Sequence, residues 1–287
     1  MRLLVVPKRA LLAASFFCAS LLLSPSGSAT NCQNNQFDER VTVAKVFDGD
    51  TVQLADGRHL RFIGINTPER GRDNRPAEPL ADAAKQQLES LLSTDKLLLL
   101  HYDQERKDRH GRLLAHPHLA DGRNLTQVML QTGLGFHIAV PPNLLFLECY
   151  QQAERGARQQ QRGLWQQPYD QPQPARQLSP TTTGFRRVSG TVSRIGESQT
   201  AYWINLGTNL ALRLPKSDLH YFPFAPASLL GKTLTVRGWI YLRHDELRMN
   251  LRHPASLEAI TDDGAAKQTD SASPVKAYQK TSNGYSR

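Results

Sequence analysis

The sequence predicts a mainly β protein, in which a first small β-barrel with α-helices is followed by a second small β-barrel. In residues 40–65, apolar side chains recur in three short runs that are separated by two Asp-Gly pairs, at residues 48–49 and 56–57. Asp-Gly between apolar strands is a strong hairpin signal, because both residues tolerate a positive φ. Residues 184–260 return to strand patterning after a segment rich in Gln and Pro. Strands with few helices between them favour closed barrels.

The first barrel is predicted to carry helices as well as strands. One apolar stripe at helical spacing, which we expect to face the core, is formed by Leu80, Ala84, Leu88, Leu91 and Leu92. The other expected elements are strands at residues 97–102 and 113–119 and helices near 125–132 and 143–162, the last ended by Gly163.

The second barrel is predicted from strand patterning alone. Its expected strands lie at residues 188–192, 202–206, 210–214, 234–236 and 247–251. We expect Trp203 and Trp239 in its core. Arg248, Asn250 and Arg252 alternate with apolar residues, so that one face of their strand is apolar and the other basic. That basic face either guides a polyanion or is an ordinary solvated sheet face.

Residues 1–29 have the layout of a secretory signal peptide. A basic start precedes an apolar stretch over residues 10–23, and small residues follow up to Ala29. The alternative is a membrane anchor, but about 14 apolar residues are fewer than the roughly 20 that a helix needs to span a bilayer. We therefore expect a periplasmic or secreted protein with no membrane anchor after cleavage.

The composition divides the rest of the chain into four segments. We expect a first domain at residues 30–165, a linker rich in Gln and Pro at 166–181, a second domain at 182–262 and a disordered polar tail at 263–287. The formal net charge is +9, and removal of three basic residues with the signal segment leaves +6 (9 − 3 = 6). A basic surface attracts polyanions, but a soluble basic protein without such a partner has the same composition.

Three cysteines are present, and Cys18 lies in the signal segment. Cys32 and Cys149 remain, and two cysteines in an oxidising compartment favour one disulfide. The alternative is that Cys149 is simply a buried apolar residue of its helix. The length of the loop favours the disulfide, because closing so long a loop in the unfolded chain stabilises the folded state by about 4 kcal/mol in the chain-entropy model. A zinc site is not indicated, because the ligands are few and have no recognisable spacing.

Three short segments of the first domain concentrate charge, at residues 48–51, 61–69 and 108–112. Arg61 interrupts an almost wholly apolar strand, and a buried guanidinium is costly unless an anion or a carboxylate meets it. Pro68 restrains the chain just before Glu69. Oxygen donors together with arginines suit a hard cation and a phosphate.

Each of these charges also has a structural interpretation. Asp48 requires no role beyond its turn. Arg61 with Glu69, and Arg112 with Asp108, are possible structural ion pairs.

At these segments the sequence resembles the staphylococcal (micrococcal) nuclease family. The segments D-G-D-T-V at residues 48–52, R-F-I-G-I-N-T-P-E at 61–69 and D-R-H-G-R at 108–112 are similar to the three signature blocks of that family, in the same order. The resemblance covers residues 40–165. It implies an OB-fold barrel with helices for the first domain, and the second barrel resembles another small OB-type barrel in its strand pattern.

The resemblance implies a calcium site. Its ligands would be the carboxylate of Asp50, the side chain of Asn66 and the backbone carbonyl of Thr67. The best-known member of the family has Asp where this chain has Asn66. A neutral amide oxygen can still bind calcium, but we expect a lower affinity with less charge.

The resemblance also implies the catalytic residues. Glu69 would position or deprotonate the attacking water. Arg61 and Arg112 would bind the phosphate oxygens and neutralise the charge that develops during in-line attack. Lys107 and Arg109 are surface charges that we expect to contact the nucleic-acid backbone.

The segment after Gly133 lacks the tyrosines that line the base pocket of the best-known member, so base stacking is not expected there. His137 in this segment is interpreted as a structural histidine and is given no catalytic role. The sequence therefore predicts an exported, calcium-dependent nuclease that hydrolyses DNA, RNA or both. The alternative is an OB-fold protein of the cell envelope that binds nucleic acid without cutting it.

Overall fold

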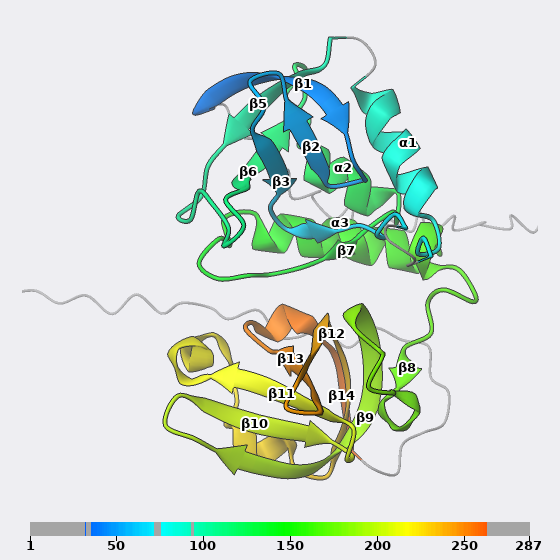
Figure 1. The fold of residues 1–287 in the computed structure, drawn as a ribbon, viewed down its shortest axis with the longest axis vertical. Helices are drawn as coiled ribbons and strands as arrows, with labels where there is room; N and C mark the ends of the chain where they lie inside the picture. Colours follow the sequence, from blue (N-terminus) through cyan, green and yellow to red (C-terminus); the bar gives the residue numbers. More distant parts are fainter. Residues whose placement is uncertain (1–31, 33–35, 72–75, 93–94, 263–287) are drawn as a thin grey trace, which may run out of the picture. The chain divides into compact units, whose positions relative to one another are not determined.

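The computed structural model describes residue 32 and residues 36–71, 76–92 and 95–262, which contain two barrels of five strands each (Figure 1). The predicted signal peptide at residues 1–29 and the predicted tail at 263–287 lie outside the described residues. Within the described ranges, no helix is long and apolar enough to cross a membrane.

The first barrel closes in the order β1-β2-β3-β6-β5, and β5 pairs again with β1. Its strands are β1 (Glu39–Val46), β2 (Thr51–Leu54), β3 (His59–Phe62), β5 (Leu97–His101) and β6 (Leu113–His118). The pairing of β3 with β6 is parallel and the other four are antiparallel. This is the closed five-stranded arrangement of an OB-fold, as the sequence predicted.

Three helices and one short two-stranded antiparallel sheet complete the first barrel. They are α1 (Ala81–Leu91), α2 (Leu125–Gln131), α3 (Leu147–Gln159) and the pair β4 (Ile65–Asn66) and β7 (Phe136–His137). The predicted start of α3 at residue 143 was four residues too early. Asn143 accepts from Glu105 N and donates to Glu105 O, each at 2.8 Å, so its amide holds a loop instead of starting the helix.

Gly64 places β4 directly against α3. Its φ is +88°, and an added Cβ would lie 2.3 Å from the ring of Tyr150. A side chain larger than hydrogen therefore does not fit there, because both the backbone conformation and the space exclude it. This close contact fixes the position of β4, and of the residues that follow it, relative to α3.

The second barrel has the same strand order as the first. Its strands are β9 (Gly184–Glu197), β10 (Ala201–Leu206), β11 (Leu210–Pro215), β12 (Lys232–Arg243) and β13 (Glu246–Asn250). The order β9-β10-β11-β13-β12 closes through the pairing of β12 with β9, and β11 runs parallel to β13. Between β11 and β12, where the first barrel has α1, the chain forms the short 3-10 helices η3 (Lys216–Tyr221) and η4 (Pro226–Leu229).

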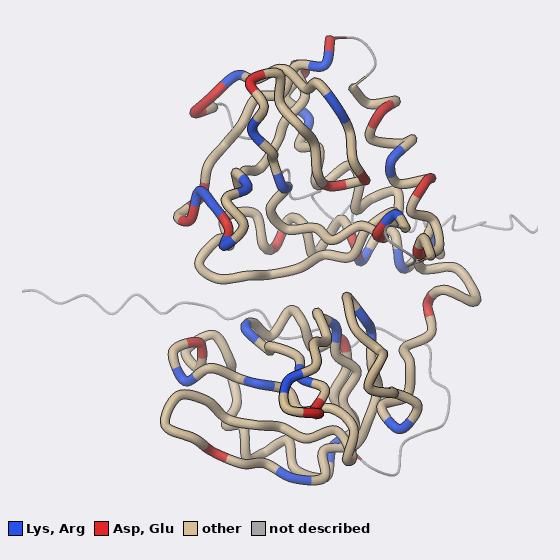
Figure 2. The backbone as a smooth tube through the Cα atoms, in the orientation of Figure 1, with Lys and Arg blue, Asp and Glu red and all other residues tan. Residues whose placement is uncertain are grey.

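Short elements flank the second barrel. The segment predicted as a linker contains β8 (Gln173–Pro174), which pairs in parallel with β9, and the 3-10 helix η2 (Ala175–Gln177), which follows η1 (Gly163–Trp165). The last strand, β14 (Leu257–Asp262), pairs with β12. In residues 184–262, Lys and Arg outnumber Asp and Glu by ten to six, so the second barrel is basic (Figure 2).

Two details of the second barrel differ from the prediction. Trp239 is 42% exposed, so its assignment to the core was wrong, and Trp203 is only partly buried. Both occupy outward positions in strands whose neighbouring residues, Ile240 and Ile204, fill the core. Arg252 does not lie on an open basic face, because its Nε donates to Asp218 at 2.7 Å.

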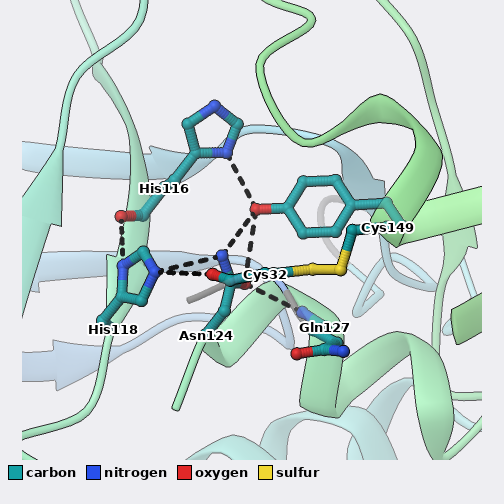
Figure 3. Close-up of a disulfide and its surroundings, with 7 residues drawn as sticks. Cys32, His116, His118, Asn124, Gln127 and Cys149 are labelled. Carbon is teal, nitrogen blue, oxygen red and sulfur yellow. Dashed lines mark hydrogen bonds between the residues drawn. A yellow bond between two sulfur atoms is a disulfide. The ribbon is translucent and has the colours of Figure 1, made fainter. Parts of the chain in front are cut away.

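A disulfide joins Cys32 to Cys149 of α3, with a Cα–Cα distance of 5.7 Å (Figure 3). Beside it lies a buried network of polar side chains. His116 Nδ1 lies 2.8 Å from the hydroxyl of Tyr150, to which Asn124 Nδ2 donates at 3.0 Å. The disulfide therefore ties the start of the described chain to the helix that packs against this network.

We predict that removing the disulfide lowers the free energy of unfolding by about 4 to 5 kcal/mol, since it closes a loop of more than a hundred residues in the unfolded chain. The sequence separation is 117, and both cysteines are buried. Urea unfolding of a variant with Cys32→Ser and Cys149→Ser measures this difference. Reductant should destabilise the original protein equally and leave the variant unchanged, and a loss below about 1 kcal/mol would contradict the prediction.

Candidate active site

Asp50 directly precedes β2, in a turn that packs tightly against the chain after β4. An added Cβ at Gly49 would lie 2.7 Å from Thr67 Cγ2 and 2.8 Å from Ala84 Cβ, so only glycine fits beside these residues. Asp48 Oδ1 accepts a hydrogen bond from the backbone N–H of Asp50 at 3.0 Å. Asp48 thus stabilises the turn, and the turn brings Asp50 to Thr67.

Asp50 is 3% exposed, and both oxygens of its carboxylate have partners. Oδ2 accepts from the backbone N–H of Thr67 at 2.6 Å and from its hydroxyl at 3.0 Å. Oδ1 accepts from Thr51 Oγ1 at 2.9 Å and forms an ion pair with Nη1 of Arg61. These contacts hold the carboxylate in one orientation, since hydrogen bonds to a buried charged group are strong.

Arg61 projects from β3 and is 9% exposed. Besides its ion pair with Asp50, Nη2 donates to Oδ1 of Asn66 at 3.0 Å. Burial lowers the pKa of Arg61 to about 10, against the opposing effect of the negative charge of Asp48. The guanidinium therefore remains charged at neutral pH.

Asn66 and Thr67 are buried at the end of the two-stranded sheet of β4 and β7, where Asn66 is the Cα partner of Phe136. The side-chain oxygen of Asn66 and the carboxylate of Asp50 contact the same guanidinium. Nδ2 of Asn66 lies 3.4 Å from the carbonyl oxygen of Thr67. Three oxygen donors of the kind that hard cations prefer are thus grouped in one cluster, and they have the chemistry to hold such a cation.

Glu69 follows this cluster and is exposed, while its backbone is held by Glu78. The backbone N–H of Glu69 donates to Glu78 Oε2 at 3.0 Å, and the backbone N–H of Glu78 donates to the carbonyl oxygen of Glu69 at 2.9 Å. The other oxygen of Glu78, Oε1, accepts from Nη1 of Arg186 at 2.9 Å. Glu78 was not predicted from the sequence, because no local pattern connects two glutamates nine residues apart across a loop.

Arg112 is presented by a turn that ends one residue before β6. Asp108 accepts from the backbone N–H of Arg112 at 2.9 Å and from its Nε at 2.7 Å. In the parallel pairing of β3 with β6, Leu113 is the partner of Leu60, so Arg112 comes next to the strand that carries Arg61. The ion pair between Arg112 and Asp108, one of the structural alternatives, is therefore present.

The site residues named from the sequence lie in two groups. Direct contacts join Asp50, Arg61, Asn66 and Thr67. Glu69 and Arg112 lie near enough for their charges to act on Arg61, the first raising and the second lowering its pKa.

Outside these groups, Lys107 and Arg109 are exposed on the turn before β6. In the part of the chain that the structure describes, no group of three or more His, Cys, Asp and Glu is arranged to hold a metal ion.

His137 is buried in β7 and serves the fold, as the sequence analysis assumed. Its Nδ1 lies 2.9 Å from the carbonyl oxygen of Gly64, and its backbone N–H donates to Glu154 Oε1 at 2.7 Å. Nη1 of Arg237 donates to the same carboxylate oxygen at 2.7 Å. Burial first, and then the positive charge of Arg237, lower the pKa of His137 to about 3.

We predict that the free energy of unfolding falls as the pH drops below about 6.5, where the histidine of the unfolded chain takes up a proton. Folded His137 takes up that proton only near pH 3, so its contribution is lost between these two values. Its slope is about 1.4 kcal/mol per pH unit. Denaturant unfolding from pH 4 to 7 should show a shallower slope for His137→Gln. The exposed His59→Gln is the control, and equal slopes in the His137 variant and the original protein would refute the prediction.

The chain is similar in sequence to known proteins. The family model described as "Staphylococcal nuclease homologue" matches residues 59–167. The chain is 34% identical over 131 residues to "Thermonuclease" of Staphylococcus intermedius, which covers 45% of this chain and 77% of that protein. It is 32% identical over 136 residues to "Thermonuclease" of Staphylococcus hyicus, with 46% and 79% covered.

A third relative is "Endonuclease YncB" of Bacillus subtilis (strain 168), 28% identical over 129 residues, with 44% of this chain and 61% of that protein covered. The residues that match the family model contain β3, β4, the turn before β6 and all three helices. The match ends before β9, so the second barrel lies outside it.

Proposed function

Since the chain belongs to the staphylococcal nuclease family and is a nuclease, we propose that it hydrolyses phosphodiester bonds of DNA, RNA or both with calcium as its metal, outside the cytoplasm. The observation that carries the proposal is the contact of Arg61 with both Asp50 and Asn66, with Thr67 on the other carboxylate oxygen. A guanidinium and a group of oxygen donors at one place suit a phosphate and a hard cation together.

The proposed calcium ligands are the carboxylate of Asp50, Oδ1 of Asn66 and the carbonyl oxygen of Thr67. When bound, calcium supplies Lewis-acid stabilisation of the charge on the scissile phosphate. The chain contributes the orientation of the ligands. Thr67 and Thr51 donate to opposite oxygens of Asp50, which leaves the carboxylate little freedom to rotate.

The proposed chemistry belongs to three side chains. Glu69 accepts the proton of the attacking water, and the two backbone hydrogen bonds to Glu78 hold its main chain for this purpose. Arg61 and Arg112 bind oxygens of the scissile phosphate, with the largest gain when charge builds up in the transition state. Lys107 and Arg109 contact phosphates further along the strand.

A plasmid-nicking assay, repeated with single-stranded RNA, tests this proposal. We expect cleavage with calcium and a loss of at least about 100-fold with a chelator, because the metal stabilises the charge of the transition state. Because Asn66 provides a neutral ligand, half-maximal activity should need more calcium in the original protein than in Asn66→Asp. Cleavage that is unaffected by the chelator would rule out the calcium site.

A second candidate function is binding of nucleic acid without cleavage, and Asn66 in place of a carboxylate is the observation that favours it. This candidate predicts a retarded but intact plasmid in the same assay, with calcium present. The nuclease proposal predicts nicked and linear products.

Export is part of the proposal and is supported by two features. The first 29 residues have the layout of a signal peptide, and disulfides such as that of Cys32 with Cys149 persist in oxidising compartments. Mass spectrometry of the protein recovered from periplasm and medium should show an N-terminus near residue 30. Recovery of the uncleaved chain from the cytoplasm alone would contradict export.

A further inference from the structure

The second barrel has an outward sheet face that the site in the first barrel does not use. In a five-stranded OB-type barrel, the face of the second and third strands is a common place for oligonucleotides to bind. Here these strands are β10 and β11, and β13 runs parallel to β11 on its other side. The inward residues of these strands form the core of the barrel: Ile204, Leu206, Leu212, Leu214, Leu247 and Met249.

The outward residues between them line up in two neighbouring rows across the sheet. The pairing register gives the first row as Arg194, Asn205, Ala211, Arg248 and Tyr241. It gives the second row as Gly196, Trp203, Arg213 and Asn250. We call these nine residues the row face. It combines arginines, aromatic rings and amides, with small residues between them.

The two rows are connected by Trp203 and Arg248. The guanidinium of Arg248 lies 4.8 Å from the ring centroid of Trp203, in a cation–π contact. One guanidinium nitrogen of Arg248 donates to Glu246 at 2.7 Å. Its Nε is buried and has no hydrogen-bond partner among the residues that the structure describes. A guanidinium stacked on an indole presents both a charge and an aromatic surface.

The other two arginines of the row face, Arg194 and Arg213, lack the carboxylate partner that most arginines of the second barrel have. Arg187, Arg237 and Arg252 each donate to a carboxylate at 2.7 Å or less. No carboxylate of the described residues lies within ion-pair distance of Arg194 or Arg213. Arg243 of β12 is the one further arginine of residues 184–262 without such a carboxylate among the described residues, so two of these three unpaired arginines lie on the row face.

We propose that the row face binds single-stranded nucleic acid and so gives the enzyme a second, non-catalytic substrate site. The inference rests on the proposed nuclease function, whose substrate it would hold. Arg194 and Arg213 would contact backbone phosphates, while Trp203 would offer its free edge and face to a base. Asn205 and Asn250 have the donors and acceptors to hydrogen-bond base edges.

The test measures binding of a labelled twenty-nucleotide single-stranded DNA by fluorescence anisotropy, with the full mature chain and a chelator to prevent cleavage. A variant with Arg194→Glu and Arg213→Glu should bind at least about tenfold more weakly. Its slope of log affinity against log salt should fall by about 1.4, or about 0.7 for each lost phosphate contact. Arg176→Glu makes the same type of change at an exposed arginine of η2 and should alter neither quantity.

Trp203→Leu should weaken binding about fivefold or more without changing the salt slope, because stacking is not an ionic contact. Thermal unfolding verifies that each variant is folded. In cleavage assays with calcium, the charge-reversed variant should show a higher KM for the long strand. Its kinetics on a tetranucleotide should be unchanged, because we expect so short a strand to bind at the catalytic site alone.

Unchanged affinity and unchanged KM in the charge-reversed variant would overturn the inference. A loss of binding to anionic phospholipid vesicles but not to DNA would also overturn it, and would assign the row face to a lipid surface. If the proposed nuclease function fails, no protein variant cleaves the tetranucleotide. That result differs from loss of the row face alone, in which the tetranucleotide is still cleaved.

Discussion

Glu69→Gln should lower kcat about 10²- to 10⁴-fold, the range over which general-base catalysis contributes. An amide of nearly the same shape cannot accept the proton of the attacking water. The free energy of unfolding should remain within about 0.5 kcal/mol, because the side chain of Glu69 is exposed. Its hydrogen bonds to Glu78 are made by the backbone and persist in the variant.

Two further variants sharpen this test. Glu89→Gln removes an exposed carboxylate of α1 and should leave kcat unchanged. Glu78→Gln exchanges one acceptor for a donor next to the backbone N–H of Glu69. It should therefore lower kcat by about tenfold, which is less than the effect expected for Glu69→Gln. If Glu69→Gln turns over within twofold of the original protein, Glu69 is not the base.

The strands of both barrels could be predicted because their signal is local. Alternation of apolar residues and the Asp-Gly turns indicated β1, β2 and β3, and the apolar stripe indicated α1, with bounds that differ by one or two residues. The two-residue strands β4 and β7 were not predicted, because no periodicity exists over two residues. They nevertheless position Asn66, so the sequence shows the proposed metal ligand without showing which strands hold it in place.

The ion-pair partners of buried charged residues could not be predicted from the sequence either. It showed that Arg61 needs a negative partner, and it offered Glu69 as one alternative. The structure provides Asp50, eleven residues earlier, since β2 and β3 pair with Thr51 opposite Arg61. Register between strands decides such partners, and register depends on the turn and on the core face of every strand together.

The same applies to Glu78 and Arg186. Each is an ordinary charged residue in its local sequence, and only the folded chain brings Glu78 to the backbone of Glu69 and Arg186 to Glu78. By contrast, the residues whose chemistry could be assigned from the sequence lie within three compact motifs. In the proposed mechanism the motif residues carry the reaction, and non-local residues hold them in position.

Arg61→Gln should lower kcat about 10²- to 10³-fold, the typical cost of losing one preorganised donor to the transition state. It should also destabilise the fold by about 3 to 5 kcal/mol, because it leaves Asp50 buried without its counter-charge. Arg112→Gln is the matched comparison. It should lower kcat similarly, but it should change stability by less than about 1 kcal/mol, since Arg112 is only partly buried and its partner Asp108 is also reached by solvent.

Calcium distinguishes the two arginines further. A cation on Asp50 replaces the charge that Arg61→Gln removes, so calcium should stabilise this variant more than it stabilises the original protein or Arg112→Gln. Urea unfolding with calcium and with chelator measures the difference, and plasmid nicking measures kcat on the same preparations. Equal stabilisation of all three proteins would show that calcium does not bind at Asp50. Full activity of Arg61→Gln would show that the phosphate is not held by Arg61.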